Sequence, residues 1–119
     1  MHRHTISFKN AFYGIWTALV TQVNVRIHFL LGSLVLLAAA LLHLPLSSVL
    51  DLVLTIAIVL VAEMANTAIE ALSDAVTREH NPYIKQAKDV AAGGVLLAAI
   101  LAIIVGLIIF FPYILKIGN

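Results

Sequence analysis

Two long runs of this chain contain no charged residue, and they constrain its fold more than any other feature. The first covers the 24 residues from Ile27 to Leu50, and the second covers the 26 residues from Val90 to Leu115. An α-helix needs about 20 apolar residues to cross the hydrocarbon core of a bilayer. A third stretch, Leu52 to Leu72, is also apolar but carries several polar side chains. The pattern predicts an all-α integral membrane protein with three transmembrane helices, at about 27–43, 50–72 and 90–112.

The composition supports a membrane setting and excludes several other classes of protein. Hydrophobic residues make up 62% of the 119 residues and charged residues 11%, against roughly 45–50% and about 25% in soluble domains. Small domains bury the smallest fraction of their surface, so this apolar surplus excludes a soluble monomer. The absence of cysteine excludes disulfides and thiolate sites, and a net charge of +1 gives no reason to expect nucleic acid as a partner. We expect one membrane domain over residues 1–119.

The connections between the predicted helices carry the helix breakers and most of the basic residues. Pro45 interrupts the first connection and Asn81-Pro82 the second, because proline resists a helix interior. Six of the seven Lys and Arg residues precede the first membrane helix or lie between the second and the third: Arg3, Lys9, Arg26, Arg78, Lys85 and Lys88. Basic residues near helix ends favour the cytoplasmic side. We therefore expect a multi-pass protein of the cytoplasmic membrane, with the N-terminus and the 73–89 connection in the cytoplasm.

The N-terminal segment, about residues 5–25, has the pattern of an amphipathic surface helix. Apolar side chains recur there at spacings of three and four: Phe8, Ala11, Phe12, Ile15, Leu19 and Val23. Such a helix with aromatic anchors lies in the plane of the membrane interface. Its position leaves open whether it only anchors the chain or also covers a site.

The polar residues of the middle helix fall on one narrow stripe. Glu63, Asn66, Glu70 and Asp74 lie within about 80° of arc at 3.6 residues per turn. Ionisable residues inside a membrane helix are costly and normally face a cavity or a partner helix. Interhelical hydrogen bonds in an oligomer are one explanation, but asparagine alone would supply them. Repeated acids facing one way instead favour a cation, and oxygen ligands suit Mg²⁺.

A second polar cluster lies in the predicted cytoplasmic connection and at the entry of the third membrane helix. It consists of Glu79, His80 and Asn81, followed by Lys88 and Asp89. Lys88 is placed to neutralise a phosphate chain, and Asp89 to contact a metal or to orient Lys88, although a membrane-proximal lysine and a helix-starting aspartate are equally ordinary. The chain has no Walker A motif. Small residues four apart, Gly94, Ala98, Ala102 and Gly106, favour close helix packing.

Together these residues resemble a known family. The motif Glu63-x-x-Asn66-Thr67-Ala-Ile-Glu70-x-x-x-Asp74, followed by Ala87-Lys88-Asp89, is similar to that of the small prokaryotic lipid kinases, diacylglycerol kinase and its undecaprenol kinase branch. The resemblance extends over nearly the whole chain. Asn66-Thr67 and the segment from Gly106 to Pro112 look closer to the undecaprenol kinases.

The resemblance implies an architecture and a set of residue roles. It implies a homotrimeric bundle of three-helix subunits in a bacterial cell membrane, with surface helices and with active sites between neighbouring subunits. Glu63 then corresponds to the general base that takes the proton of the lipid hydroxyl, and Glu70 to a Mg²⁺ ligand. Asn66, Asp74 and Arg26 correspond to further active-site residues. The ATP contacts correspond to Arg3, Asn10, Glu79, His80, Asn81, Lys88 and Asp89.

One position departs from the family pattern. Where the family usually has a second metal-binding glutamate, just before Asn24 and Arg26, this chain has Gln22. An amide oxygen can ligate Mg²⁺ but brings no charge, so we expect Gln22 to be a weakened metal ligand, with Asp74 and Asp89 as candidates to compensate.

The resulting hypothesis is an ATP- and Mg²⁺-dependent kinase that phosphorylates a lipid alcohol, with undecaprenol favoured and diacylglycerol as the alternative substrate. A hypothesis of another class is a non-catalytic trimeric membrane protein that has lost metal binding at Gln22. The joint presence of Glu63, Glu70 and Lys88 argues against it, because helix packing needs none of the three.

Overall fold

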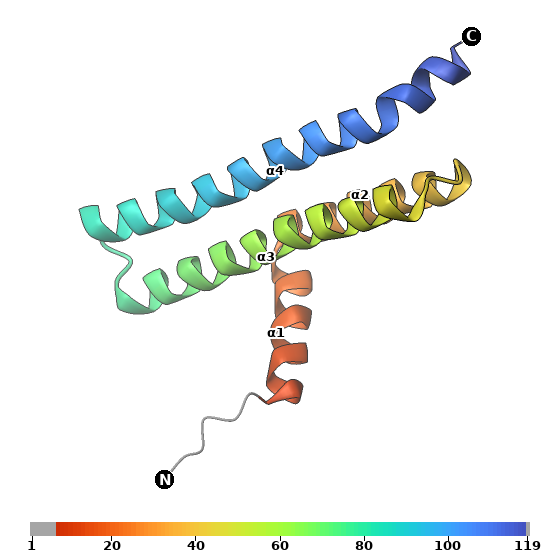
Figure 1. The fold of residues 1–119 in the computed structure, drawn as a ribbon. Coiled ribbons are helices and arrows are strands. Elements are labelled where there is room, and N and C mark those ends of the chain that lie inside the picture. Colours follow the sequence, from red (N-terminus) through yellow and green to blue (C-terminus); the bar gives the residue numbers. More distant parts are fainter. Residues whose placement is uncertain (1–6, 119) are drawn as a thin grey trace.

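The computed structural model describes residues 7–118, and these residues contain helices joined by short connections, with no strand among them (Figure 1). The helices are α1 (Phe8–Thr21), α2 (Val23–Leu41), α3 (Leu46–Val76) and α4 (Pro82–Ile117). By length and composition, α2, α3 and α4 are able to cross a membrane. The predicted all-α membrane fold with three spanning helices and a short N-terminal helix is therefore confirmed.

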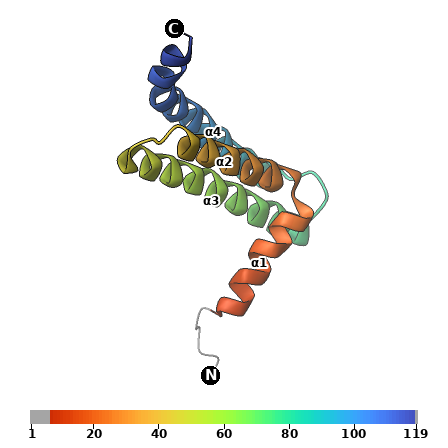
Figure 2. The ribbon, with the colours of Figure 1, turned by 90° about the vertical axis from the view of Figure 1, so that its right-hand side faces the viewer.

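The three long helices run alongside one another, whereas α1 leaves them steeply (Figures 1 and 2). α3 packs against both α2 and α4, and α1 contacts the nearby parts of α2 and α3. Most large apolar side chains of α1 are exposed, including Phe8, Phe12, Tyr13 and Trp16. The angle and the exposed aromatic residues suit a helix that lies along a membrane surface while the other three cross it.

The boundary between α1 and α2 lies at Gln22, earlier than the predicted end of the surface helix near residue 25. Gln22 has an extended backbone (φ −115°, ψ 112°), which ends one helix and begins the next. The Arg26 guanidinium then donates to the carbonyls of Leu19 and Val20, at 2.9 and 2.8 Å. A cation on the last carbonyls of a helix satisfies acceptors that have no intrahelical partner. Arg26 thus fixes the bend between α1 and α2.

The long helices extend beyond the spans predicted from hydropathy. α3 starts four residues before and ends four residues after the expected 50–72 segment, and α4 starts at Pro82 rather than near residue 90. With 31 and 36 residues, α3 and α4 are about 46 and 54 Å long, against a hydrocarbon core of about 30 Å. Hydropathy detects only the apolar part of a helix that lies in lipid. It does not detect the polar turns that extend the same helix beyond the membrane.

Local chemistry explains where α4 begins. The Asn81 side chain accepts hydrogen bonds from the backbone N–H groups of Tyr83 and Ile84, at 2.9 and 3.2 Å. Pro82 occupies the first helical position, where its missing N–H has no consequence. Asn81 and Pro82 therefore form a strong helix start, and Lys88 and Asp89 lie well inside the helix instead of at its entry.

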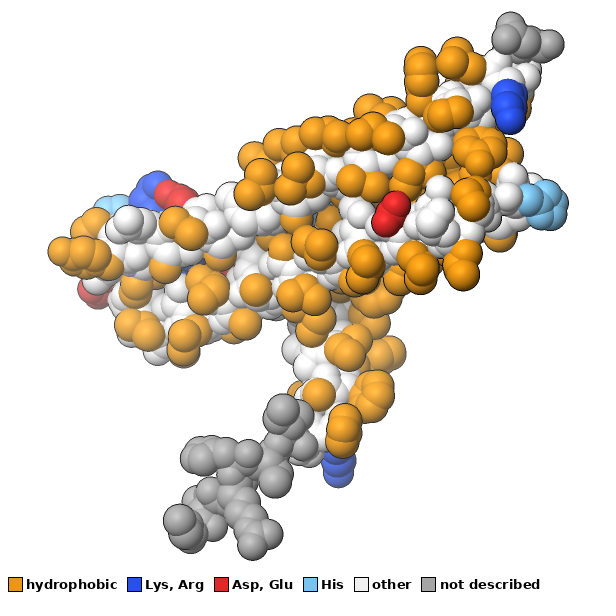
Figure 3. Space-filling model, in the orientation of Figure 1, with side chains coloured by type: hydrophobic (Ala, Val, Ile, Leu, Met, Phe, Trp, Pro, Cys, Tyr) orange, Lys and Arg blue, Asp and Glu red, His pale blue; other side chains and the backbone are white. Residues whose placement is uncertain are grey.

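The described chain is too open to be a complete folding unit in water. Its accessible surface is 9233 Å², whereas a compact soluble monomer of 12.8 kDa would expose about 6300 Å². Its radius of gyration is 17.9 Å, against about 13.5 Å for a compact domain of this length. Hydrophobic side chains cover most of the face in Figure 3, and most charged side chains lie toward the ends. Lipid or other copies of the chain must cover this surface.

Close packing between helices occurs at a glycine that the sequence pattern did not single out. A Cβ atom on Gly32 of α2 would lie 2.8 Å from Cγ2 of Ile56 on α3. Ala98 of the predicted small-residue stripe is buried, but Gly94 and Gly106 have no atom of the described chain within 4 Å of a Cβ position. Within one chain, α2 thus packs closely on α3 at Gly32.

Candidate active site

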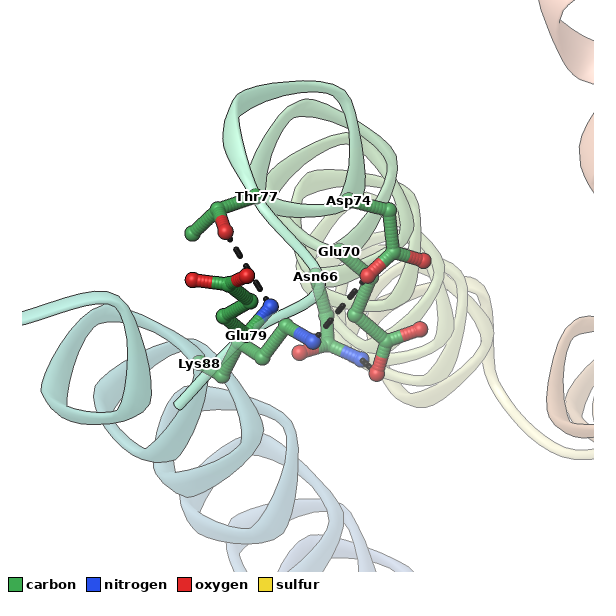
Figure 4. A network of polar contacts seen from close by, with 6 residues as sticks. All are labelled: Asn66, Glu70, Asp74, Thr77, Glu79 and Lys88. Atoms are coloured by element: carbon green, nitrogen blue, oxygen red, sulfur yellow. Dashed lines mark hydrogen bonds and ion pairs between the residues drawn. The ribbon is translucent and has the colours of Figure 1, made fainter. Parts of the chain in front are cut away.

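The polar stripe of α3 grades from buried to exposed along the helix. Glu63 is buried, with 3% of its surface accessible, Asn66 and Glu70 are half-buried, and Asp74 is exposed near the end of α3. Figure 4 shows Asn66, Glu70 and Asp74 following one another along α3, with Lys88 of α4 opposite Asp74. The stripe predicted from the sequence exists as a continuous polar track leading from the middle of the bundle to the connection between α3 and α4.

At the buried end of the track, Glu63 meets a histidine of another helix. Oε1 of Glu63 lies 3.1 Å from Nδ1 of His28 on α2. The distance is that of an ion pair, but the atoms are not aligned for a hydrogen bond, and Nδ1 has no hydrogen-bond partner in the described chain. We take the contact as a close electrostatic approach, because distance and direction must both be right for a hydrogen bond.

In the middle of the track, Asn66 and Glu70 are joined side chain to side chain. Nδ2 of Asn66 donates to Oε1 of Glu70 at 3.3 Å, one turn further along the helix. The other polar atom of the amide, Oδ1 of Asn66, is buried and has no partner in the described chain. A buried oxygen without a partner beside a carboxylate is suited to accept a cation or a donor group.

The side-chain oxygens in this part of the track are of the type that a magnesium ion prefers as ligands. Within residues 7–118, no three His, Asp or Glu side chains gather closely enough to hold a metal by themselves. Mg²⁺ is commonly bound by one or two carboxylates together with waters and substrate phosphates, so a closed protein cage is not required. In this chain, the Glu70 carboxylate and the Oδ1 atom of Asn66 are the groups that would hold the magnesium ion.

At the exposed end of the track, an ion pair joins the two longest helices. Nζ of Lys88 lies 3.2 Å from Oδ1 of Asp74, linking α4 to α3 beside the connection. The expectation that Asp89 orients Lys88 is wrong, because Asp89 pairs with Lys85 at 2.6 Å, one turn back on α4. Both pairs are exposed, so each contributes little to stability, but Lys88 is held over the end of the polar track.

The connection between α3 and α4 is ordered by its own side chains. The Thr77 hydroxyl accepts a hydrogen bond from the backbone N–H of Glu79 at 3.1 Å (Figure 4). Asn81 is predicted to contact the nucleotide, and in the structure its side-chain oxygen caps α4. It therefore has a structural role. The side chains of Glu79 and His80 are exposed and lie in the connection next to the Asp74–Lys88 pair.

The predicted site residues of the N-terminal segment lie in different surroundings. Arg3 is outside the described residues. Asn10 is exposed on the first turn of α1, where its backbone N–H bonds the Ser7 cap at 3.4 Å. Arg26 is engaged with the end of α1. The structure therefore brings neither Asn10 nor Arg26 into contact with the polar track.

Gln22 is half-buried at the α1–α2 junction, and the helix geometry indicates its level relative to Glu70. His28 of α2 lies opposite Glu63 of α3, and the two helices run in opposite directions. Six residues back along α2 and seven residues on along α3 correspond to about 9 and 10 Å of rise. Gln22 and Glu70 are thus at similar levels, although no direct contact joins them in a single chain.

His28 lies beside the polar track, and the sequence pattern did not indicate it. Histidine is counted as neutral in the uncharged run from Ile27 to Leu50, and His28 lies at the start of that run. An ionisable side chain inside a membrane helix is itself a sign of function, so counting histidine would have drawn attention to it.

An apolar cleft adjoins the buried end of the track. It lies between α2, α3 and α4, has a volume of about 450 Å³, and is lined mainly by apolar residues, among them Val59, Ala102 and Phe110. His28 lines the same cleft. The imidazole therefore stands between an apolar space and the buried carboxylate of Glu63.

Comparison with known proteins identifies the family of the chain. A sequence profile described as prokaryotic diacylglycerol kinase matches residues 9–110, which is most of the molecule and includes the whole polar track. The chain belongs to the prokaryotic diacylglycerol kinase family. The family expected from the central motif is thereby confirmed, and its two curated relatives bear the names of lipid kinases, the class of enzyme expected.

Two curated relatives differ in the lipid that their names state. The chain is 45% identical over 112 residues to a diacylglycerol kinase of Synechocystis sp., an alignment that covers 93% of this chain and 64% of that protein. It is 37% identical over 112 residues to the undecaprenol kinase of Bacillus subtilis, covering 94% of this chain and 91% of that protein. The chain thus spans somewhat less than two thirds of the first relative and nearly all of the second, and the two names leave the lipid substrate open.

Proposed function

We propose that this protein transfers the γ-phosphoryl group of ATP to the hydroxyl group of undecaprenol, in a Mg²⁺-dependent reaction at the cytoplasmic face of the bacterial cell membrane. The observation that carries the proposal is the polar track of α3, with a buried carboxylate at one end and a lysine held over the other. A carboxylate at that depth is useful as a base only if the attacked hydroxyl belongs to a membrane lipid. Family membership supports the same class of reaction.

The residues of the track divide the work of phosphoryl transfer, which is mostly positioning and charge neutralisation. Glu63 accepts the proton of the lipid hydroxyl as its oxygen attacks the γ-phosphorus and ADP leaves. Glu70 and Asn66 would hold Mg²⁺, which would supply positive charge to neutralise the phosphates. Lys88 gives a positive charge to the phosphate chain at the water-facing end, and Glu79 and His80 contact the nucleotide from the connection.

The distribution of basic residues supports the proposed side of the membrane. Arg78, Lys85 and Lys88 lie in or next to the connection between α3 and α4, and the opposite end of the bundle carries Lys116. The positive-inside tendency therefore favours a cytoplasmic connection, which is also where ATP is available to the exposed end of the track.

The open site and apolar faces of a single chain support a homotrimer as the working form of the protein. Of the 36 residues of α4, Ala98 is the one buried residue, and Gly94 of its small-residue stripe has no atom of the described chain within 4 Å of a Cβ position. Small residues at such positions allow helices to approach closely. A neighbouring subunit would cover this face and supply the remaining walls of the site.

Diacylglycerol is the second candidate substrate, favoured by the 45% identity to the Synechocystis protein of that name. Purified protein in mixed micelles, given ATP, Mg²⁺ and equal mole fractions of one lipid or the other, separates the two. Higher kcat/KM for undecaprenol supports the proposal, and higher kcat/KM for diacylglycerol assigns the alternative. No transfer to either lipid, by protein that remains folded, refutes both and favours a non-catalytic trimeric membrane protein.

A further inference from the structure

The one buried carboxylate among the described residues has a partner from a different helix. Glu63 of α3 has 4% of its side chain accessible, and Nδ1 of His28 on α2 lies 3.1 Å from its Oε1 atom. No lysine or arginine in the described chain forms an ion pair with Glu63, since the other ion pairs there involve Asp74 and Asp89. Among the described residues, His28 is thus the ionisable side chain that pairs with the candidate base.

Helix packing alone does not explain this pair. A buried polar pair that serves only structure is normally fully hydrogen-bonded, because an unsatisfied buried group lowers stability by about 1–3 kcal/mol. Here Nδ1 comes within 3.1 Å but makes no aligned hydrogen bond. Catalytic hydrogen bonds are often poorly aligned before substrate binds and tighten in the substrate complex.

The imidazole also occupies a defined place relative to the apolar cleft. His28 lines the cleft between α2, α3 and α4, and 24% of its side chain is accessible while Glu63 is almost closed off. The backbone around it is firmly placed, because Gly32, one turn further along α2, packs directly on Ile56 of α3. An added methyl group at Gly32 would therefore disturb the packing of α2 on α3 one turn away from His28.

We propose that His28 is a positioning residue for Glu63: its Nδ1–H group holds Oε1 of the carboxylate and so leaves Oε2 directed at the hydroxyl of the lipid acceptor. This inference rests on the proposed kinase function and adds a residue to its machinery. The proton of the acceptor passes to Glu63, and His28 keeps its own proton throughout. Correct orientation of a reacting group contributes strongly to rate, since a displacement of about 1 Å can lower it about a hundredfold.

Two amide substitutions distinguish the two ring nitrogens. In His28→Asn the side-chain N–H group lies near the position of Nδ1, whereas in His28→Gln it lies near that of Nε2. We expect His28→Asn to keep kcat within about threefold of wild type. We expect His28→Gln and His28→Ala to lower kcat about tenfold or more, with the KM for ATP unchanged. His43→Asn, at the opposite end of α2, is the matched control and should leave kcat unchanged.

A double-mutant cycle keeps the test decisive if one variant folds poorly. His28→Ala introduced into Glu63→Gln should cause no further loss of the residual rate, because a positioning residue acts only through the group it holds. Equal rates for His28→Asn and His28→Gln, wild-type activity of His28→Ala, or an additive loss in the cycle would each overturn the inference. In all three cases the wild-type protein would still be an active kinase. Absence of lipid phosphorylation by wild type would instead refute the proposed function itself.

Discussion

At the scale of single residues, the most specific proposal is that Glu63 is the general base. It is a buried acid in the middle of a membrane helix, where an ionisable group is tolerated chiefly for function. Asp51 lies near the start of the same helix, where it is exposed and forms no ion pair in the described chain. Two acids on one helix thus have opposite surroundings, which provides a matched pair for mutagenesis.

Glu63→Gln should abolish phosphoryl transfer while the protein remains folded. The amide keeps the size of the side chain but cannot accept the acceptor's proton, so we expect kcat to fall about a hundredfold or more, with little change in nucleotide affinity. Steady-state kinetics and ATP-analogue binding measure the two effects. Asp51→Asn, the control, should retain wild-type kcat. Near-normal turnover by Glu63→Gln would show that another group is the base.

Gln22 gives a second prediction at this scale. It lies near the level of Glu70, at the junction of α1 and α2, where water can fill a vacant ligand position. Gln22→Glu adds a negative charge, and hard cations are held largely by such charge. The Mg²⁺ concentration that gives the half-maximal rate should therefore decrease. Gln86→Glu makes the same chemical change on exposed α4 and should leave the Mg²⁺ curve where it is. An unaltered curve in Gln22→Glu would place Gln22 outside the metal site.

At the scale of elements, the register between α2 and α3 is what brings His28 to Glu63. That register is fixed at Gly32, where an added Cβ would meet the Ile56 side chain at 2.8 Å. Isoleucine is stiff at χ1 in a helix, so Cγ2 cannot simply rotate away. The close approach of the two helices is therefore sensitive to one methyl group.

Gly32→Ala should destabilise the protein and lower its activity together. Overpacking of this kind typically costs about 1–3 kcal/mol, which thermal unfolding in detergent would detect as a lower Tm. Adding Ile56→Ala should restore part of the Tm, because the two changes act on one contact. Gly14→Ala, on α1 with no atom within 4 Å of the new methyl group, serves as control. If Gly32→Ala unfolds at the wild-type temperature, α2 and α3 do not pack as described.

The elements also show how far the sequence could be interpreted. The uncharged runs predicted three spanning helices, and the spacing of acids predicted the α3 track, because both depend on local periodicity. Three features needed the structure: the early start of α4 at Pro82, the pairing of Lys88 with Asp74 in place of Asp89, and the contact of His28 with Glu63. The last two join residues 14 and 35 positions apart, and one-dimensional spacing carries no information on such distant pairs.

At the scale of the whole molecule, the open surface of a single chain predicts that active sites are shared. The described chain exposes about half as much surface again as a compact monomer would. Its polar track also has no closed set of three metal-binding side chains. A neighbouring subunit would cover this apolar surface and would complete the metal site.

Mixed trimers test this sharing. Chains inactivated by Glu63→Gln and chains inactivated by Gln22→Arg, which places a cation near the metal site, should regain partial activity when co-expressed. In some mixed sites one subunit then supplies an intact α3 track and its neighbour an intact α1–α2 junction. Two affinity tags would isolate the mixed species. Mixed trimers with no activity would indicate that each subunit holds its own complete site.

The central claim, that this chain is a kinase whose acceptor is a membrane lipid alcohol, is tested most directly by following the γ-phosphate of labelled ATP. Purified wild-type protein is incubated in micelles with Mg²⁺, with or without undecaprenol or diacylglycerol, and label is counted in the extracted lipid. We predict lipid-dependent ATP consumption with matching recovery of label in the lipid phase. Folded protein that consumes no ATP with either lipid, or that releases all the label as inorganic phosphate, would contradict the claim.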